Sequence, residues 1–181
     1  FEASYGGAEA NVAVSLAVLK DPVSFVTKLP ENPVGTAALN EVRRYGADTS
    51  KVVIGGSRLG IYFFEKGTDI RPTNVVYDRE GSALALAKPE EFHWDEILKD
   101  TDIFYFSGVT PAVSENIAKA VLEALKYCKA HGIETVCDLN YRSKMWDTKK
   151  AQSVMSELMN YVTLCIANDE DFESSLGIHA Y

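Results

Sequence analysis

The sequence predicts an α/β protein with a mostly parallel β-sheet, helices on its faces and a small antiparallel β-insertion. Short apolar runs alternate with stretches of helical period, and runs such as residues 102–106 are nearly continuous, as in buried parallel strands. Between residues 52 and 83 the helical period disappears and turn residues separate β-rich runs. We expect one domain over residues 1–181, with a β-lid formed by roughly residues 1–7 and 53–83.

Length and composition narrow the classes of protein. The 181 residues, 46% of them hydrophobic and 24% charged, suit one soluble domain with a real core. The formal net charge of −8 argues against a nucleic-acid partner, and no apolar run approaches a membrane span. Three widely spaced cysteines, Cys128, Cys137 and Cys165, indicate reduced core thiols and therefore a cytoplasmic protein. Because no Met begins the chain and residues 1–5 read as part of a strand, we expect a segment incomplete at both ends.

The first predicted helix follows two adjacent glycines. Gly6 and Gly7 allow a sharp turn, and the Ala-rich residues after them favour a helix to about Leu19. One interpretation is a plain turn before a core helix. The other is a binding site for an anion or a polyhydroxyl ligand at the helix N-terminus, where Asn11 offers an amide donor and acceptor. A short strand over residues 23–29 and a helix over residues 35–45 then begin a strand–helix alternation.

The insertion interrupts this alternation. Residues 60–65 and 74–79 are predicted to pair as antiparallel strands. Tyr77 and Arg79 are two residues apart and share one face of their strand, so together with Tyr62 they could cover a polar ligand. A cross-strand packing pair with a solvated arginine is the structural alternative.

Strands and helices alternate again in the second half. We expect strands at residues 102–106, 134–139 and 163–167, and helices at residues 114–130, 148–161 and 169–177. Ligands of open α/β sheets bind beyond the carboxyl ends of the strands. The residues to inspect are therefore 107–108, 140–142 and 168–171.

Polar residues follow two of these strands. If the chain stays extended, Asp138, Asn140 and Arg142 point to one side, and Arg142 could clamp a carboxylate or phosphate. An Asp138–Arg142 structural pair is equally compatible with the sequence. Residues 168–171, Asn-Asp-Glu-Asp, are explained by N-capping of the next helix or by Mg²⁺ coordination through water.

Taken in order, these segments resemble the ribokinase-like (PfkB) family of carbohydrate kinases. Residues 6–13, Gly-Gly-Ala-Glu-Ala-Asn-Val-Ala, are similar to the family's N-terminal signature, and a β-lid follows in the expected place. Residues 138–142 resemble its strand-end motif. Residues 168–171 resemble its Asn-x-x-Glu segment, with Asp171 in place of Glu. Within the family, residues 59–63 and 76–83 most resemble the 2-keto-3-deoxygluconate kinases.

The resemblance implies a ribokinase-like fold and an ATP-dependent phosphorylation of 2-keto-3-deoxygluconate on its terminal hydroxyl, with ATP and Mg²⁺ as cofactors. Separately, the composition of the β-lid predicts an outer face apolar enough to pair with a second copy, which would form a homodimer. The resemblance implies an acceptor-sugar site in which glycines and Asn11 hold hydroxyls, tyrosines cover the sugar, and arginines meet its acid end or its ring oxygens. The implied sugar-site residues are Gly6, Gly7, Asn11, Tyr62, Tyr77, Arg79, Asn140 and Arg142. Asn168 and Asp171 are implied to be associated with nucleotide and metal, without ligating the metal directly.

One family motif is absent from the 181 residues. The Gly-Ala-Gly-Asp segment, whose Asp is the family's general base, does not occur, so we expect no catalytic base in this segment. Two other functions remain open: a fructokinase- or ribokinase-type kinase of a neutral sugar, and a non-catalytic sugar-binding protein of the same fold.

Overall fold

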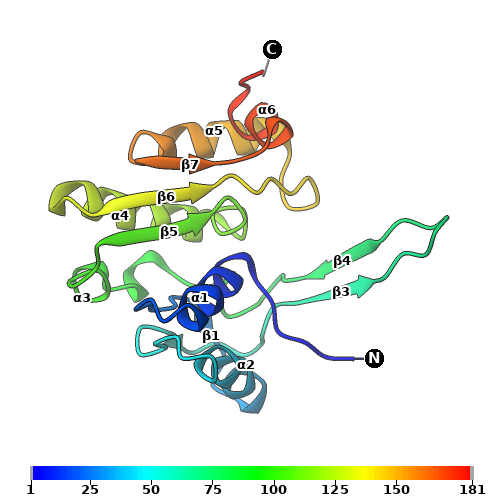
Figure 1. Cartoon of the computed structure of the whole chain (residues 1–181), viewed down its shortest axis with the longest axis horizontal. Helices are drawn as coiled ribbons and strands as arrows, with labels where there is room; N and C mark the ends of the chain where they lie inside the picture. The colour runs from blue at the N-terminus through cyan, green and yellow to red at the C-terminus, as the bar shows by residue number, and fades with distance from the viewer. Residues whose placement is uncertain (1, 180–181) are drawn as a thin grey trace.

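The computed structural model describes residues 2–179 (Figure 1). Helices and strands alternate along most of the chain, and the predicted order of elements is confirmed. The elements are α1 (Ala8–Val18), β1 (Lys28–Leu29), α2 (Pro33–Arg43), β2 (Val53–Ile54), β3 (Ile61–Glu65), β4 (Asn74–Asp78), the 3₁₀ helix η1 (Pro89–Glu91), α3 (Trp94–Ile97), β5 (Ile103–Ser107), α4 (Glu115–His131), β6 (Glu134–Asp138), α5 (Thr148–Met159), β7 (Leu164–Ile166) and α6 (Asp169–Leu176).

The main sheet is parallel, as the apolar runs predict. Its three described strands lie in the order β5-β6-β7, with Ser107 opposite Asp138 and Asp138 opposite Ile166 in the register. β1 and β2 form a separate two-stranded parallel sheet. β1 is much shorter than the predicted run over residues 23–29, where only a single bridge from Ser24 to Asp48 extends the pairing.

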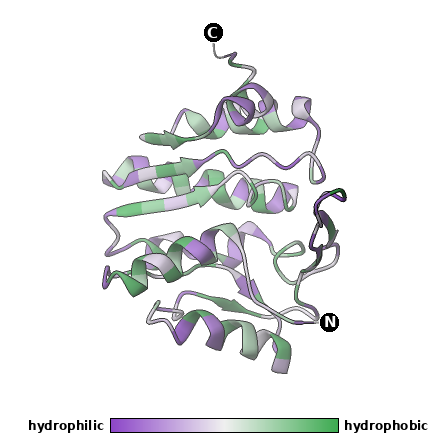
Figure 2. Cartoon of the chain, turned by 45° about the vertical axis from the view of Figure 1, so that its right-hand side comes forward, coloured by the Kyte–Doolittle hydropathy of each residue, from purple (hydrophilic) through white to green (hydrophobic). Residues whose placement is uncertain are grey.

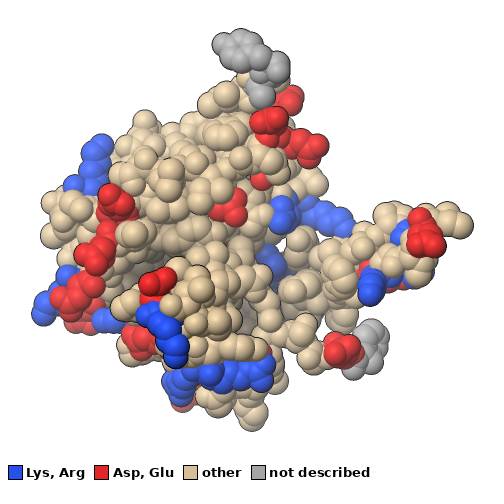
Figure 3. All heavy atoms as spheres, viewed as in Figure 1, with Lys and Arg blue, Asp and Glu red and all other residues tan. Residues whose placement is uncertain are grey.

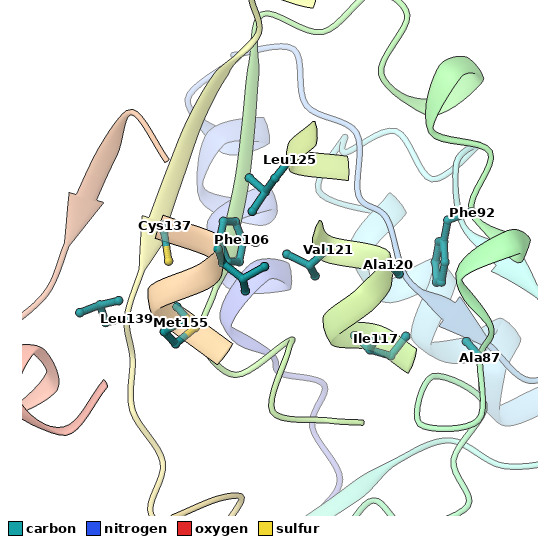
Figure 4. Packing of buried hydrophobic residues seen from close by; sticks show 11 residues of the cluster. Ala87, Phe92, Phe106, Ile117, Ala120, Val121, Leu125, Cys137, Leu139 and Met155 are labelled. Carbon is teal, nitrogen blue, oxygen red and sulfur yellow. The ribbon is translucent and has the colours of Figure 1, made fainter. Parts of the chain in front are cut away.

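The largest core lies between β5, β6 and the helices α4 and α5. Phe106 and Cys137 point from the strands toward Val121 of α4 and Met155 of α5 (Figure 4). β5 is hydrophobic along nearly its whole length, whereas the helices alternate between hydrophobic and hydrophilic faces (Figure 2). This is the pattern expected of a strand in a covered parallel sheet and of helices with one wet face.

Helix ends follow the sequence signals closely. The Ser114 hydroxyl accepts a hydrogen bond from the Ile117 N–H at the start of α4, and Gly132 ends that helix in the left-handed conformation with φ of 73°. Asp147 caps α5 through the Lys150 N–H in the same manner. These caps satisfy backbone groups that a helix leaves unpaired and so fix where each helix begins and ends.

β3 and β4 form an antiparallel hairpin that projects from the body of the molecule (Figure 1). Tyr62 lies opposite Tyr77 in the register, so the predicted pairing of residues 60–65 with 74–79 is confirmed. Two boundaries of the predicted lid are wrong. Residues 2–7 form no strand, with Phe1 outside the described residues, and Val53–Ile54 pairs with β1 because it continues the body of the protein.

Candidate functional site

The carboxyl ends of β5 and β6 meet at one edge, on the side from which the hairpin projects (Figure 1). Gly108, the residue after β5, donates from its N–H to the carbonyl of Asp138 at 2.8 Å. A Cβ on Gly108 would lie 2.1 Å from the carbonyl oxygen of Leu139. Glycine is therefore required here by the close approach of two backbones.

The N-terminus of α1 is open at this edge. Gly7 is the N-cap residue, and no side chain caps the first turn of the helix. Asn11 is exposed, and among residues 2–179 its side-chain amide makes no hydrogen bond, although its carbonyl accepts from the Ser15 hydroxyl at 2.8 Å. Unpaired N–H groups and a free amide are groups that can bind hydroxyls or an anion.

The hairpin carries its tyrosines to the residues before α1. A Cβ built on Gly6 would lie 2.9 Å from the hydroxyl oxygen of Tyr62, so that hydroxyl lies beside the Gly6 backbone. The ring centroids of Tyr62 and Tyr77 are 6.4 Å apart, and the Arg79 guanidinium lies 4.5 Å from the centroid of Tyr77. Two aromatic rings and one cation therefore lie on the face of the hairpin that is turned toward Gly6.

The hairpin also contacts the loop that follows β6. The Lys144 ammonium donates to the side-chain oxygen of Asn74 at 3.2 Å and to the carbonyl of Val75. Arg79 donates to the sulfur of Met145 at 3.4 Å. Lysine and arginine side chains accordingly gather where the hairpin meets the body (Figure 3). No periodicity in the sequence indicated Lys144, because this loop residue binds to a strand that is distant in the sequence.

The predicted alternation of Asp138, Asn140 and Arg142 is wrong. β6 ends at Asp138, and Asn140 has φ of 37°, so the backbone leaves the extended conformation. Asparagine tolerates this left-handed region better than most residues do. The Arg142 side chain is exposed and donates to the carbonyl of Tyr141 at 2.7 Å, which leaves most of its donors available.

Acidic residues also lie at this edge of the sheet, together with Arg79 and Arg142. Burial raises the pKa of Asp138, and the Asp171 carboxylate raises it further, while Arg142 lowers it. Burial beside Asp138 and Glu9 also raises the pKa of Tyr105 to about 12. An anionic ligand at this edge therefore needs the arginines, because the half-buried carboxylates would repel it.

Asn168 and Asp171 have structural partners of their own. The Asn168 side-chain oxygen accepts from the Asp171 N–H at 2.7 Å as the N-cap of α6. One carboxylate oxygen of Asp171 accepts from the Tyr141 N–H at 3.1 Å. Over residues 2–179, no cluster of three or more His, Cys, Asp or Glu could hold a metal ion. Asp171 retains one carboxylate oxygen, which suits contact with Mg²⁺ through water rather than a protein-built metal centre.

Glu9, like Lys144, is a residue of this edge that no pattern in the sequence indicated. Its carboxylate joins α1 to the end of β5, nearly a hundred residues further along the chain. An acidic residue in a first helical turn is common for electrostatic reasons alone, so the sequence held no specific signal. Within the described part of the chain, no helix is long and apolar enough to cross a membrane.

Comparison with known proteins identifies the class. The model of the pfkB family of carbohydrate kinases matches residues 1–180, and the chain belongs to this family. A putative ribokinase II from E. coli has the same fold, with a TM-score of 0.87 at 17% identity, a likeness that concerns the fold alone. The ribokinase-like fold class is thereby confirmed.

Two relatives are more similar. The chain is 47% identical to a crystal structure of 2-dehydro-3-deoxygluconokinase from Thermotoga maritima, with a TM-score of 0.96, covering 99% of this chain and 55% of that one. It is 37% identical over 172 residues to a 2-dehydro-3-deoxygalactonokinase from Haloferax volcanii, covering 95% of this chain and 54% of that protein. The chain thus spans about half the length of the relatives that it matches.

Proposed function

We propose that the protein containing this chain phosphorylates a 2-keto-3-deoxy sugar acid on its terminal hydroxyl. The leading candidate for this substrate is 2-keto-3-deoxygluconate. The observation that carries the proposal is the Tyr62, Tyr77 and Arg79 group beside Gly6, with Arg142 on the neighbouring loop. Two guanidinium groups suit a carboxylate, and tyrosine rings suit the covering of a sugar. Membership of a carbohydrate kinase family and the names of the two relatives support the same substrate class.

In this proposal the 181 residues supply the acceptor side of the site. The open N-terminus of α1, with Gly7 and Asn11, binds sugar hydroxyls, and Asn140 turns the chain so that Arg142 reaches the acid end. The hairpin covers the sugar and excludes water, which limits hydrolysis of the phosphoryl donor. We propose that the general base and most of the nucleotide site belong to sequence that these residues do not include, because no Gly-Ala-Gly-Asp segment occurs in them.

ATP is the proposed phosphoryl donor, on the basis of family membership. Mg²⁺, when bound to the phosphates, would neutralise the charge that develops during transfer. Asn168 and Asp171 are proposed to lie near the nucleotide, with Asp171 contacting the metal through water. Because the three cysteines are free thiols, as is usual in a reducing compartment, we propose a cytoplasmic location.

The proposed homodimer uses the other face of the hairpin. Ile61 and Val76 alternate with the two tyrosines and are 44% and 52% exposed. Pairing this face with a second copy would bury apolar surface at a site that otherwise faces water. Sedimentation of the intact protein at micromolar concentration tests this proposal: we expect a dimer, and Val76→Asp should dissociate it. A monomeric wild-type protein would refute it.

The substrate is tested by steady-state kinetics with 2-keto-3-deoxygluconate, its C4 epimer and fructose. We expect the keto acids to be preferred, and Arg79→Ala to raise KM for the keto acid roughly tenfold or more while changing any activity on fructose little. Arg44→Ala, which removes an exposed arginine paired with Glu41 on α2, is the matched control. Preference for fructose that survives Arg79→Ala would indicate a neutral-sugar kinase, and binding without phosphoryl transfer would indicate a non-catalytic protein.

A further inference from the structure

We propose that Glu9 is a positioning residue that holds the N-terminus of α1 against the end of β5. The inference rests on the proposed function, since it assigns to Glu9 the placement of the sugar-binding residues Gly7 and Asn11. Glu9 itself need not touch the sugar. Its carboxylate instead fixes where the start of the helix lies relative to the strand ends that carry Asn140 and Arg142.

One carboxylate oxygen of Glu9 accepts three hydrogen bonds. The donors are the Ser107 N–H at 2.9 Å, the Ser107 hydroxyl at 2.8 Å and the Thr110 hydroxyl at 2.5 Å. All three distances lie within the range of well-formed hydrogen bonds, and the bond from Thr110 is the shortest. Ser107 is fully buried, and its hydroxyl also accepts from the Val109 N–H at 3.3 Å, so the anchor on the β5 side is rigid.

The apolar residues Ala8, Ala10 and Val12 at the start of α1 are only partly buried, so few specific contacts fix its position. Ala13 is the one buried residue of the helix, and the N-cap Gly7 contributes no side chain. Within the described chain, Glu9 is also the one residue of α1 whose side chain hydrogen-bonds outside the helix. The side-chain hydrogen bonds of Glu9 therefore add directional contacts to partial apolar packing and fix the placement of the first turn.

The contact continues from β5 to the arginine loop. Next to Ser107, Gly108 donates to the carbonyl of Asp138, the last residue of β6. Glu9, β5 and β6 thus form one hydrogen-bonded series that ends two residues before Asn140. Both halves of the proposed sugar site are placed by this series, because Gly7 and Asn11 lie within two residues of Glu9.

An electrostatic explanation alone does not account for the geometry. An acidic residue in the first turn of a helix can stabilise the helix from an exposed position, by interacting with the positive end of its dipole. Glu9 instead directs one oxygen at three donors of another element, with two of them on a fully buried residue. A residue that served the dipole alone would not need these partners.

The experiment uses the intact protein with Glu9→Ala, Glu9→Gln and Thr110→Val. Glu123→Gln is the matched control, because Glu123 is an exposed carboxylate of α4 without a side-chain partner among residues 2–179. We expect Glu9→Ala to raise KM for the sugar acid roughly ten- to a hundred-fold and to change KM for ATP less than about twofold. Glu9→Gln, which keeps one acceptor oxygen, should lie between wild type and Glu9→Ala.

Thr110→Val should raise the same KM by a smaller factor, and should add nothing to Glu9→Ala, because the two residues share one bond. An equal rise of the KM values for the sugar acid and for ATP, or a fall of kcat alone, would overturn the inference. A general loss of folded protein would not affect the sugar acid selectively.

A second measurement does not depend on the reaction. Hydrogen exchange of the amides of residues 11–14, the first in α1 that donate to backbone carbonyls of the helix start, should accelerate at least about tenfold in Glu9→Ala and remain unchanged in Glu123→Gln. Unchanged exchange in Glu9→Ala overturns the inference whatever the wild-type protein phosphorylates. If wild type prefers a neutral sugar, the proposed substrate fails, and the KM comparison with that sugar decides the role of Glu9.

Discussion

Replacing Gly108 by alanine tests how tightly the two strand ends are joined. The added Cβ would lie 2.1 Å from the carbonyl oxygen of Leu139, whereas real Cβ contacts stay beyond 3.0 Å, so one backbone must move by most of an ångström. Overpacking of this kind destabilises a fold by about 1–3 kcal/mol. Displacing the Gly108 N–H from the Asp138 carbonyl removes a further ~1 kcal/mol. We expect a loss of roughly 2–4 kcal/mol in the free energy of unfolding.

Urea unfolding and sugar-acid kinetics of the intact protein measure the two consequences of Gly108→Ala. The control is Gly132→Ala, at the far end of α4, where φ is 73° and no atom lies within 4 Å of the new Cβ. That variant should lose about 1–2 kcal/mol through backbone strain and keep KM for the sugar acid unchanged. Gly108→Ala should raise this KM as well as lose stability. An unchanged KM, or a smaller loss of stability than in Gly132→Ala, would refute the reasoning.

Three further predictions concern the same edge and the body. Gly7→Ala should change the free energy of unfolding by less than ~0.5 kcal/mol, since its Cβ meets only the Ala10 Cβ at 3.6 Å, yet it should raise KM for the sugar acid; unaltered kinetics would remove Gly7 from the site. Asp138→Asn should raise the melting temperature at pH 7, because burial and a neighbouring carboxylate raise the pKa of Asp138 and its charge opposes folding at neutral pH. That gain should vanish below about pH 4, where both folded and unfolded states are protonated; a gain that persists at pH 3 would contradict the charge argument. Glu91 has a lowered pKa, mainly through its hydrogen bond from Lys28, so its contribution to stability is present above about pH 4.3 and is lost as the pH falls through its folded pKa. Urea midpoints at pH 6 and pH 3 should therefore differ less in Glu91→Gln than in wild type, and an equal difference would count against this ion pair.

The order of elements could be predicted from sequence because its signals are local. Ser114 and Gly132 bound α4 through side-chain capping and a left-handed residue, and both effects depend on neighbouring residues alone. The hairpin pairing likewise followed from two β-rich runs around a turn. The strand over residues 23–29 was predicted too long, because pairing partners rather than propensity decide how far a strand extends.

The site was less accessible to sequence reasoning. The alternation argument failed at Asn140, where a positive φ ends the extended geometry that alternation assumes. The roles of Glu9 and Lys144 depend on partners that lie 98 and 70 residues away, and no local pattern encodes such contacts. Asn168 shows the opposite case, since its structural role as an N-cap was visible in the sequence and is confirmed.

The long separation between Glu9 and Ser107 also bears on the order of folding. The hairpin and the helix ends are built from neighbouring residues and can form as soon as their own segments are available. The start of α1, in contrast, cannot reach its final place until β5 and Thr110 have been synthesised and have docked. Loop closure over about a hundred residues is entropically unfavourable and slow compared with local steps. The first segment of the site to leave the ribosome is therefore among the last to acquire its working geometry.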